Sequence, residues 1–168
     1  MERTKIADLR QHIGEKVKVQ GFLQTLRDQK KMQFLILRDL SGLVQVAFWK
    51  ANDPDLAEKI SATPTESVVS VTGTVVDNPI VKLGGLEIQL ETYEVIGPAE
   101  APIPLDPTAE ALPSIDYRLD WRFLDMRRPP VTTLFKIQTT AEAAFREYWL
   151  KHDSVSYTHL TLPTIYSV

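Results

Sequence analysis

Five stretches in which apolar and polar residues alternate fill most of the first 97 residues, and they constrain the fold more than any other feature. Alternation with a period of two is typical of β-strands that bury one face. Gly21 and Gly73 interrupt the first and the fourth stretch, and a glycine within a strand often marks the bend of a barrel corner. The pattern predicts a mainly β protein with five strands, at residues 15–27, 32–39, 43–49, 67–76 and 86–96.

Two short helices accompany these strands. Residues 5–13 place Ile6, Leu9 and Ile13 at helical spacing, and residues 54–60 begin with a proline, Pro54, suited to a first helical turn. Five strands with a helix between the third and the fourth are typical of the OB-fold barrel, which binds oligonucleotides on the face of strands 2 and 3. An SH3-like or other small barrel fits the number of strands as well.

The second part of the chain has a different composition. Five prolines between residues 98 and 113 predict an extended linker. From residue 131 to about residue 152 apolar residues recur along one helical stripe: Leu134, Ile137, Ala141, Phe145, Tyr148 and Trp149. A helix with so aromatic a stripe requires a partner surface.

The final stretch, residues 154–168, contains no charged residue, unlike the preceding chain. Such an abrupt change predicts a non-native tail, such as vector sequence read through in frame. The alternative is a genuine exposed polar strand.

Composition excludes several classes of protein. The chain has no cysteine and three scattered histidines, which argues against disulfides and metal sites. It has neither a secretory signal nor an apolar run long enough to cross a bilayer, which predicts a cytoplasmic protein. The net charge of −3 argues against binding nucleic acid through bulk charge. Any such contact must be local, and the basic residues Arg27, Lys30, Lys31 and Arg38 lie within one hairpin-sized stretch.

Two groups of residues resemble a known family. Residues 17–22, Arg27, residues 34–39 and residues 43–46 resemble the anticodon-binding OB domain of the aspartyl, asparaginyl and lysyl class II aminoacyl-tRNA synthetases. Residues 104–107 and 118–129 are similar to the hinge that leads into the catalytic domain of the aspartyl enzymes. This motif favours an aspartyl-tRNA synthetase of the archaeal-like kind. The resemblance covers residues 1–153.

The resemblance implies an organisation and an activity. Residues 1–97 would be the anticodon-binding domain, residues 98–130 the hinge, and residues 131–153 the first helix of a truncated α+β catalytic domain. That helix resembles the start of motif 1, which builds a homodimer interface in the family. The full-length enzyme would attach aspartate to tRNA with ATP and Mg²⁺. Because motifs 2 and 3 are absent, this chain is expected to contain no catalytic residue, to bind neither cofactor and to be inactive.

The resemblance also assigns anticodon-binding residues. Anticodon bases are splayed out and are read by stacking and by hydrogen bonds to their edges. Phe34 matches the residue that stacks on the second base, a uracil, and Gln45 the residue that reads its edge. Glu87 matches the residue that accepts a hydrogen bond from the amine of the third base, a cytosine. Arg27 suits a phosphate or base contact. Phe22 would flank the first base or pack in the barrel.

Each assignment has a structural alternative. Without the resemblance to the family, Phe34 would be interpreted as a core residue, Gln45 as a surface residue and Glu87 as an ordinary exposed strand residue. Arg38 and Asp39 are expected to pair with each other or with their neighbours. The rival functions are an asparaginyl-type synthetase and a free-standing OB module that binds single-stranded nucleic acid or a protein. The expected partner is tRNA-Asp, alone or together with tRNA-Asn.

Overall fold

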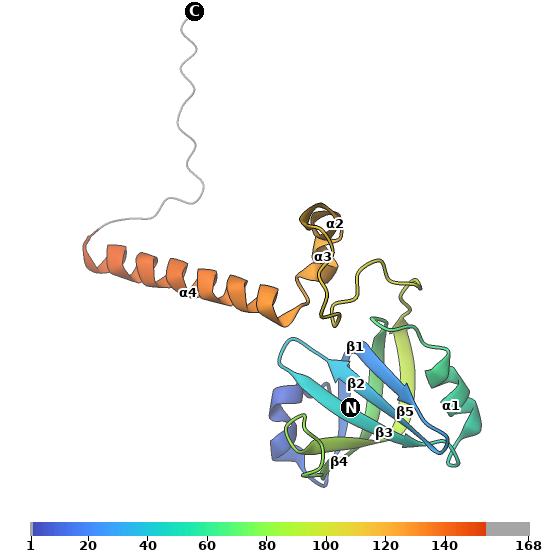
Figure 1. Ribbon diagram of the computed structural model, residues 1–168. Helices are drawn as coiled ribbons and strands as arrows, with labels where there is room; N and C mark the ends of the chain where they lie inside the picture. Colours follow the sequence, from blue (N-terminus) through green and yellow to red (C-terminus); the bar gives the residue numbers. More distant parts are fainter. Residues whose placement is uncertain (1, 154–168) are drawn as a thin grey trace, which may run out of the picture. The chain divides into compact units, whose positions relative to one another are not determined.

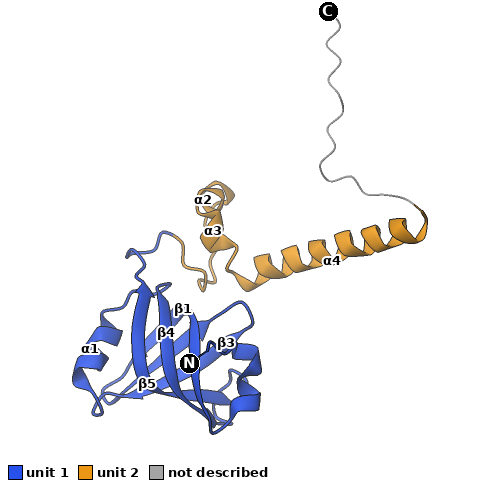
Figure 2. Cartoon of the chain, turned by 180° about the vertical axis from the view of Figure 1, so that it is seen from behind, with its two compact units in different colours: residues 1–104 blue, residues 105–168 orange. Residues whose placement is uncertain are grey.

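The computed structural model describes residues 2–153, so the tail predicted at residues 154–168 lies outside the described residues. The chain divides into two compact units between Pro104 and Leu105 (Figure 2). Within residues 2–153, the strands all lie in unit 1, and unit 2 holds three helices. The division falls within the proline-rich stretch.

Unit 1 is a five-stranded barrel (Figure 1). Its strands are β1 (Lys16–Asp28), β2 (Met32–Arg38), β3 (Leu43–Trp49), β4 (Val68–Asp77) and β5 (Leu86–Gly97). They follow one another around the barrel in the order β1-β2-β3-β5-β4, and β4 closes it by pairing with β1. All pairs are antiparallel except β3 with β5, which is parallel. The predicted five-stranded OB-type architecture is confirmed.

The inward side chains of the strands form one apolar core. On β2, Leu35 and Leu37 are completely buried, and Val44 and Val46 of β3 are buried beside them. The helix α1 (Pro54–Ser61) adds Ile60 to this core. Residues two apart on a strand share a face, so burial of one alternate set directs the other set outward.

Gly21 is required because two strands approach closely. A Cβ atom at Gly21 would lie 2.5 Å from the carbonyl oxygen of Arg38 on β2, closer than van der Waals contact allows. A bulge follows on β1 between Leu23 and Thr25, and a bulge bends a strand and increases its twist. The bend predicted at Gly21 thus corresponds to a close contact between β1 and β2.

Side-chain hydrogen bonds hold the helices of unit 1 in place. The N-terminal helix η1 (Ile6–His12) is a 3₁₀-helix, and its first amide, that of Ile6, donates to the carboxylate of Asp39 at 3.1 Å. Asp53 caps α1 by accepting from the amide of Leu56 at 2.9 Å. The fully buried side chain of Gln33 on β2 donates to the carbonyl oxygen of Ala57 at 2.9 Å and so fastens α1 to the barrel.

Unit 2 contains α2 (Ile115–Asp120), α3 (Arg122–Asp125) and α4 (Pro129–Lys151). The long helix was predicted. The two short helices were not, because six and four residues are too few for a helical period to stand out in the sequence.

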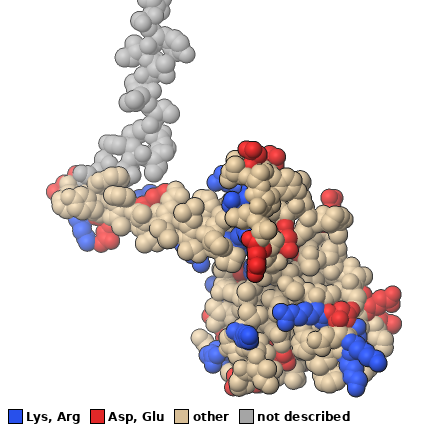
Figure 3. Space-filling view, viewed as in Figure 1, with Lys and Arg blue, Asp and Glu red and all other residues tan. Residues whose placement is uncertain are grey.

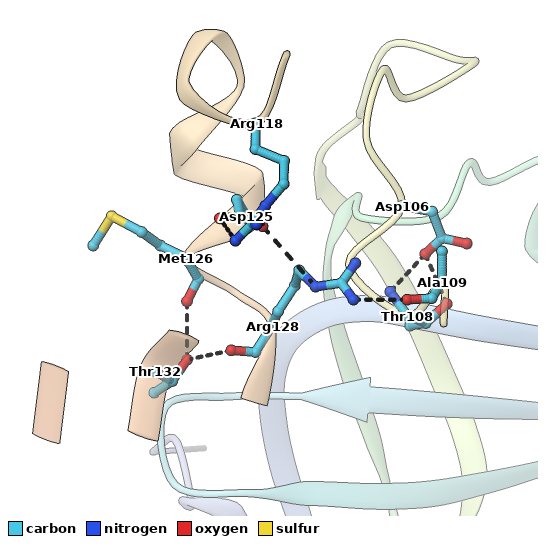
Figure 4. Close-up of polar contacts among 8 residues, drawn as sticks. All are labelled: Asp106, Thr108, Ala109, Arg118, Asp125, Met126, Arg128 and Thr132. Atoms are coloured by element: carbon cyan, nitrogen blue, oxygen red, sulfur yellow. Dashed lines mark hydrogen bonds and ion pairs between the residues drawn. The ribbon is translucent and has the colours of Figure 1, made fainter. Parts of the chain in front are cut away.

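An ion-pair cluster joins α2, α3 and the start of α4 (Figure 4). The guanidinium of Arg118 donates to both carboxylate oxygens of Asp125, at 3.0 and 2.9 Å. Arg128 donates to the carbonyl oxygen of Ala109 at 2.8 Å. The hydrogen bonds from Arg118 hold the pKa of Asp125 below its usual value, against the opposing effect of burial. The cluster therefore ties a loop residue to three helical segments.

Candidate nucleic-acid interface

Two rows of side chains cross the outer face of β1, β2, β3 and β5. The strand register defines each row, because residues paired across neighbouring strands lie about 5 Å apart and point to the same side. The first row is Arg27, Phe34, Ala47 and Gln89. The second row is Thr25, Ile36, Gln45 and Glu87. Four of the five residues singled out in the sequence thus lie in two adjacent rows.

Phe34 lies on the outer face of the barrel. Its neighbours on β2, Leu35 and Gln33, are completely buried, whereas Phe34 itself is half-buried and does not belong to the core cluster. Its register partners are Arg27 on β1 and Ala47 on β3. Ala47 is small and only 6% exposed, so its neighbours cover it.

Gln45 and Glu87 are bonded to each other. Their Cα atoms are register partners on the parallel strands β3 and β5, and Nε2 of Gln45 donates to Oε2 of Glu87 at 2.6 Å. Both side chains are half-buried on the outer face. The pair offers carboxylate and amide oxygens as acceptors and an amide group as donor, which is the chemistry needed to read base edges.

Positive charge lies at the end of the face where β1 turns into β2. Arg27 is exposed beside Phe34, and Lys30 and Lys31 are exposed in the turn. Asp28 forms an ion pair with Lys50, and hydrogen bonds from Lys50 and Ser61 hold the pKa of Asp28 below its usual value. Figure 3 shows basic side chains interspersed with acidic ones over the surface in view. The basic character is local.

Phe22 lies on the same outer face but away from Phe34. Its register partner is Arg38, four residues from Phe34 along β2 and therefore about 13 Å away. The guanidinium of Arg38 stands 5.4 Å from the centre of the Phe22 ring and donates to Glu66 at 2.7 Å. Arg38 thus pairs with Glu66 rather than with Asp39, whose carboxylate binds the 41–42 turn and Ile6.

Two residues that the sequence did not single out belong to this face. Gln89 is exposed on β5, two residues beyond Glu87. Trp49 is 51% exposed at the end of β3, four residues beyond Gln45. The alternation of strand faces could have identified both residues, because each lies an even number of positions beyond Gln45 or Glu87 on the same strand.

The described residues give two further findings. Within residues 2–153, His, Asp and Glu side chains form no group of three that could hold a metal ion. Over the same part of the chain, every helix is too short or too polar to span a membrane.

A family model for tRNA anticodon binding, described as OB-fold nucleic acid binding domain, matches residues 17–96. This match selects the OB-fold over other small barrels. It covers β1 to β5 almost completely, and it includes Phe22, Arg27, Phe34, Gln45 and Glu87.

Two relatives in sequence are aspartate–tRNA ligases. The chain is 42% identical over 137 residues to the aspartate–tRNA(Asp) ligase of Thermococcus kodakarensis, covering 81% of this chain and 31% of the relative. It is 41% identical over 135 residues to the aspartate–tRNA(Asp/Asn) ligase of Haloferax volcanii, covering 80% of this chain and 31% of the relative. The chain therefore spans about a third of the length of these relatives.

A solved structure has the same fold over most of the chain. The asparaginyl-tRNA synthetase of Pyrococcus horikoshii, complexed with asparaginyl-adenylate, matches with a TM-score of 0.79 and 29% identity, over 90% of this chain and 35% of that chain. Residues 17–96 are thus an OB-fold nucleic acid binding domain of the anticodon-binding family, on a chain related to the aspartate–tRNA ligases.

Proposed function

We propose that the outer face of β1, β2, β3 and β5 binds the anticodon loop of a tRNA, as the recognition part of an aspartate–tRNA ligase. One observation carries the proposal: an aromatic ring, an amide and a carboxylate, on Phe34, Gln45 and Glu87, share two adjacent rows of one outer face. Stacking on the ring and hydrogen bonding to the polar pair are the two contacts that splayed RNA bases require.

Each residue has a proposed role. Phe34 stacks on the second anticodon base, a contact worth about 1–3 kcal/mol. Gln45 reads the edge of that base, and Glu87 accepts from the amine of a cytosine at the third position. Arg27 contacts the backbone phosphate beside Phe34. Phe22, held against Arg38, flanks the first base.

The activity proposed for the longer protein is supported by the names of its relatives. We propose that it attaches aspartate to tRNA in the cytoplasm with ATP and Mg²⁺, and that residues 1–97, 98–130 and 131–153 serve as anticodon domain, hinge and catalytic-domain start. The relatives are named for tRNA(Asp) and for tRNA(Asp/Asn). The tRNA partner is therefore tRNA-Asp, alone or with tRNA-Asn. The 168-residue chain alone should not catalyse aspartate-dependent ATP–pyrophosphate exchange, and exchange above that of a vector control would contradict this.

The homodimer proposed for the longer protein rests on α4. Its apolar stripe is exposed in the single chain: Leu134, Ile137, Phe145, Tyr148 and Trp149. Apolar side chains in such a continuous row favour burial against another surface. Sedimentation of the full-length enzyme and of an Ile137→Glu variant tests this, because a charge in a buried interface should shift the dimer toward monomer.

The experiment that tests anticodon binding is a titration of the chain with RNA stem-loops at one fixed salt concentration. An aspartate anticodon loop should bind more tightly than the same stem with a scrambled loop. Phe34→Ala should weaken binding by about 1–3 kcal/mol, and Phe34→Tyr, which keeps the ring, should restore most of it. Equal binding of both loops would instead favour an OB module without anticodon specificity.

A further inference from the structure

The hydrogen bond between Gln45 and Glu87 fixes the orientation of the Gln45 amide. A carboxylate only accepts hydrogen bonds, so the group of Gln45 that faces it must be the NH₂ group. The donor and acceptor atoms are 2.6 Å apart, a short hydrogen bond to a carboxylate. The carbonyl oxygen of the amide therefore points away from Glu87.

The strand register makes this pairing specific. Gln45 has Ile36 as its register partner on β2, and Glu87 has Val76 as its register partner on β4. Both of these neighbours are apolar. Each polar side chain is thus flanked by an apolar one on its other side, and the two polar groups are directed to each other.

A fixed amide can distinguish bases that a rotating amide cannot. At the same ring position, uracil has an N–H donor at N3 and cytosine has a bare acceptor nitrogen. A free glutamine can turn its amide by 180° to suit either base. When Glu87 holds the NH₂ group, the outward oxygen suits the N–H of uracil and opposes the N3 of cytosine.

On these grounds, and resting on the proposed anticodon function, we propose that Glu87 is a positioning residue for Gln45. It sets the preference for uracil over cytosine at the second anticodon base, in addition to its own contact with the third base. The choice of two neighbouring bases is therefore coupled through one hydrogen bond between β3 and β5.

The test measures the preference at the second base in variants of Glu87. The chain is titrated with two stem-loops that differ only in uracil or cytosine at that position. Wild type should prefer uracil by about 10- to 100-fold, the scale of a good base contact. Glu87→Ala and Gln45→Ala should each reduce this preference to about 2-fold, and the double variant should reduce it no further. Glu87→Gln, which can bond the amide in either orientation, should also lower it.

Glu94→Ala is the matched control. Glu94 is an exposed carboxylate on the same strand as Glu87, but its register partner is Ser70 on β4, outside the two rows. It should keep the full preference for uracil. The side-chain amide NMR signals of Gln45 report its hydrogen bond to Glu87 independently of RNA. In Glu87→Ala, one NH₂ proton of Gln45 should shift, while the backbone amide spectrum should remain that of a folded protein.

The outcomes separate the two proposals. Failure of wild type to bind the anticodon loop more tightly than a scrambled loop would refute the proposed function. Specific binding with an undiminished uracil preference in Glu87→Ala would refute only the positioning role, as would additive losses in the double variant.

Discussion

Gly73 on β4 and Gln89 on β5 approach so closely that a Cβ atom at Gly73 would lie 2.1 Å from the carbonyl oxygen of Gln89. The neighbour is backbone and cannot rotate away. We therefore expect Gly73→Ala to lower the free energy of unfolding by about 3 kcal/mol, the upper part of the range for overpacking. Urea denaturation of the whole chain, followed by tryptophan fluorescence and circular dichroism, measures the change.

Gly42→Ala is the matched control for this substitution. A Cβ atom there would meet only the flexible Ile6 side chain, at 3.4 Å, and Gly42 has no positive φ. Its effect should stay within about 0.5 kcal/mol. Equal effects of the two substitutions would show that the close approach at Gly73 does not constrain the barrel.

The carboxylate of Asp39 should make unit 1 sensitive to acid. Burial raises the pKa of Asp39, but hydrogen bonds from Ser41, from the Ile6 amide and from the Gly42 amide outweigh it and lower the pKa below its usual value. A lowered pKa in the folded state means that the stabilisation is complete above about pH 5. It declines as the pH falls below about 4 toward the folded-state value.

Replacing the carboxylate by an amide tests this. At pH 7, Asp39→Asn should lower the free energy of unfolding by about 1.5–3 kcal/mol, the range for hydrogen bonds to a charged group. The difference between wild type and variant should shrink when the pH falls from 5 to 3. Asp77→Asn, at an exposed carboxylate of β4, is the control and should change little. A wild-type–Asp39→Asn difference that is independent of pH would contradict the role of Asp39.

Arg27 should act through charge alone. Since it is exposed beside Phe34, we expect Arg27→Ala to weaken the binding of all anticodon stem-loops about equally. The slope of log K against log salt should fall by roughly 1, the value for one lost phosphate contact. Titrations at several salt concentrations measure this slope. A change in base preference with an unchanged slope would instead indicate that Arg27 reads a base.

The ion pair of Arg118 with Asp125 should hold α2 and α3 together. We expect Asp125→Asn to remove its two charge-assisted hydrogen bonds and to speed amide hydrogen exchange in residues 115–128 roughly tenfold. Mass spectrometry of peptides from the exchanged chain measures the exchange of this segment. Lys151→Ala breaks the exposed pair with Glu147 and should leave exchange in residues 115–128 unchanged. Unchanged exchange in Asp125→Asn would show that the helices do not depend on the pair.

The sequence by itself determined the strands and the longer helices of the barrel and of unit 2. Alternation marked residues such as Leu35 and Leu37 as one face of a strand, and a proline followed by helical spacing marked α1. These signals are local, because each depends on residues within a few positions of one another. The short helices α2 and α3 gave no such signal.

Only the tertiary structure decided which face of β2 is inside. The alternation predicts that Phe34 and Ile36 share one face of β2. It does not say which face is buried, so Phe34 could equally have been a core residue. Closure of the barrel buries Leu35 and Leu37, and that burial directs Phe34 outward. The choice is made by packing against other strands, which no local pattern contains.

The sequence also did not predict the pairing of Gln45 with Glu87. The two residues are 42 positions apart and meet through the parallel pairing of β3 with β5, the one parallel pair among the described strands. The resemblance to the synthetase family suggested a base contact for each residue separately. Their contact with each other depends on a register between distant strands, and the barrel fixes that register only when it closes.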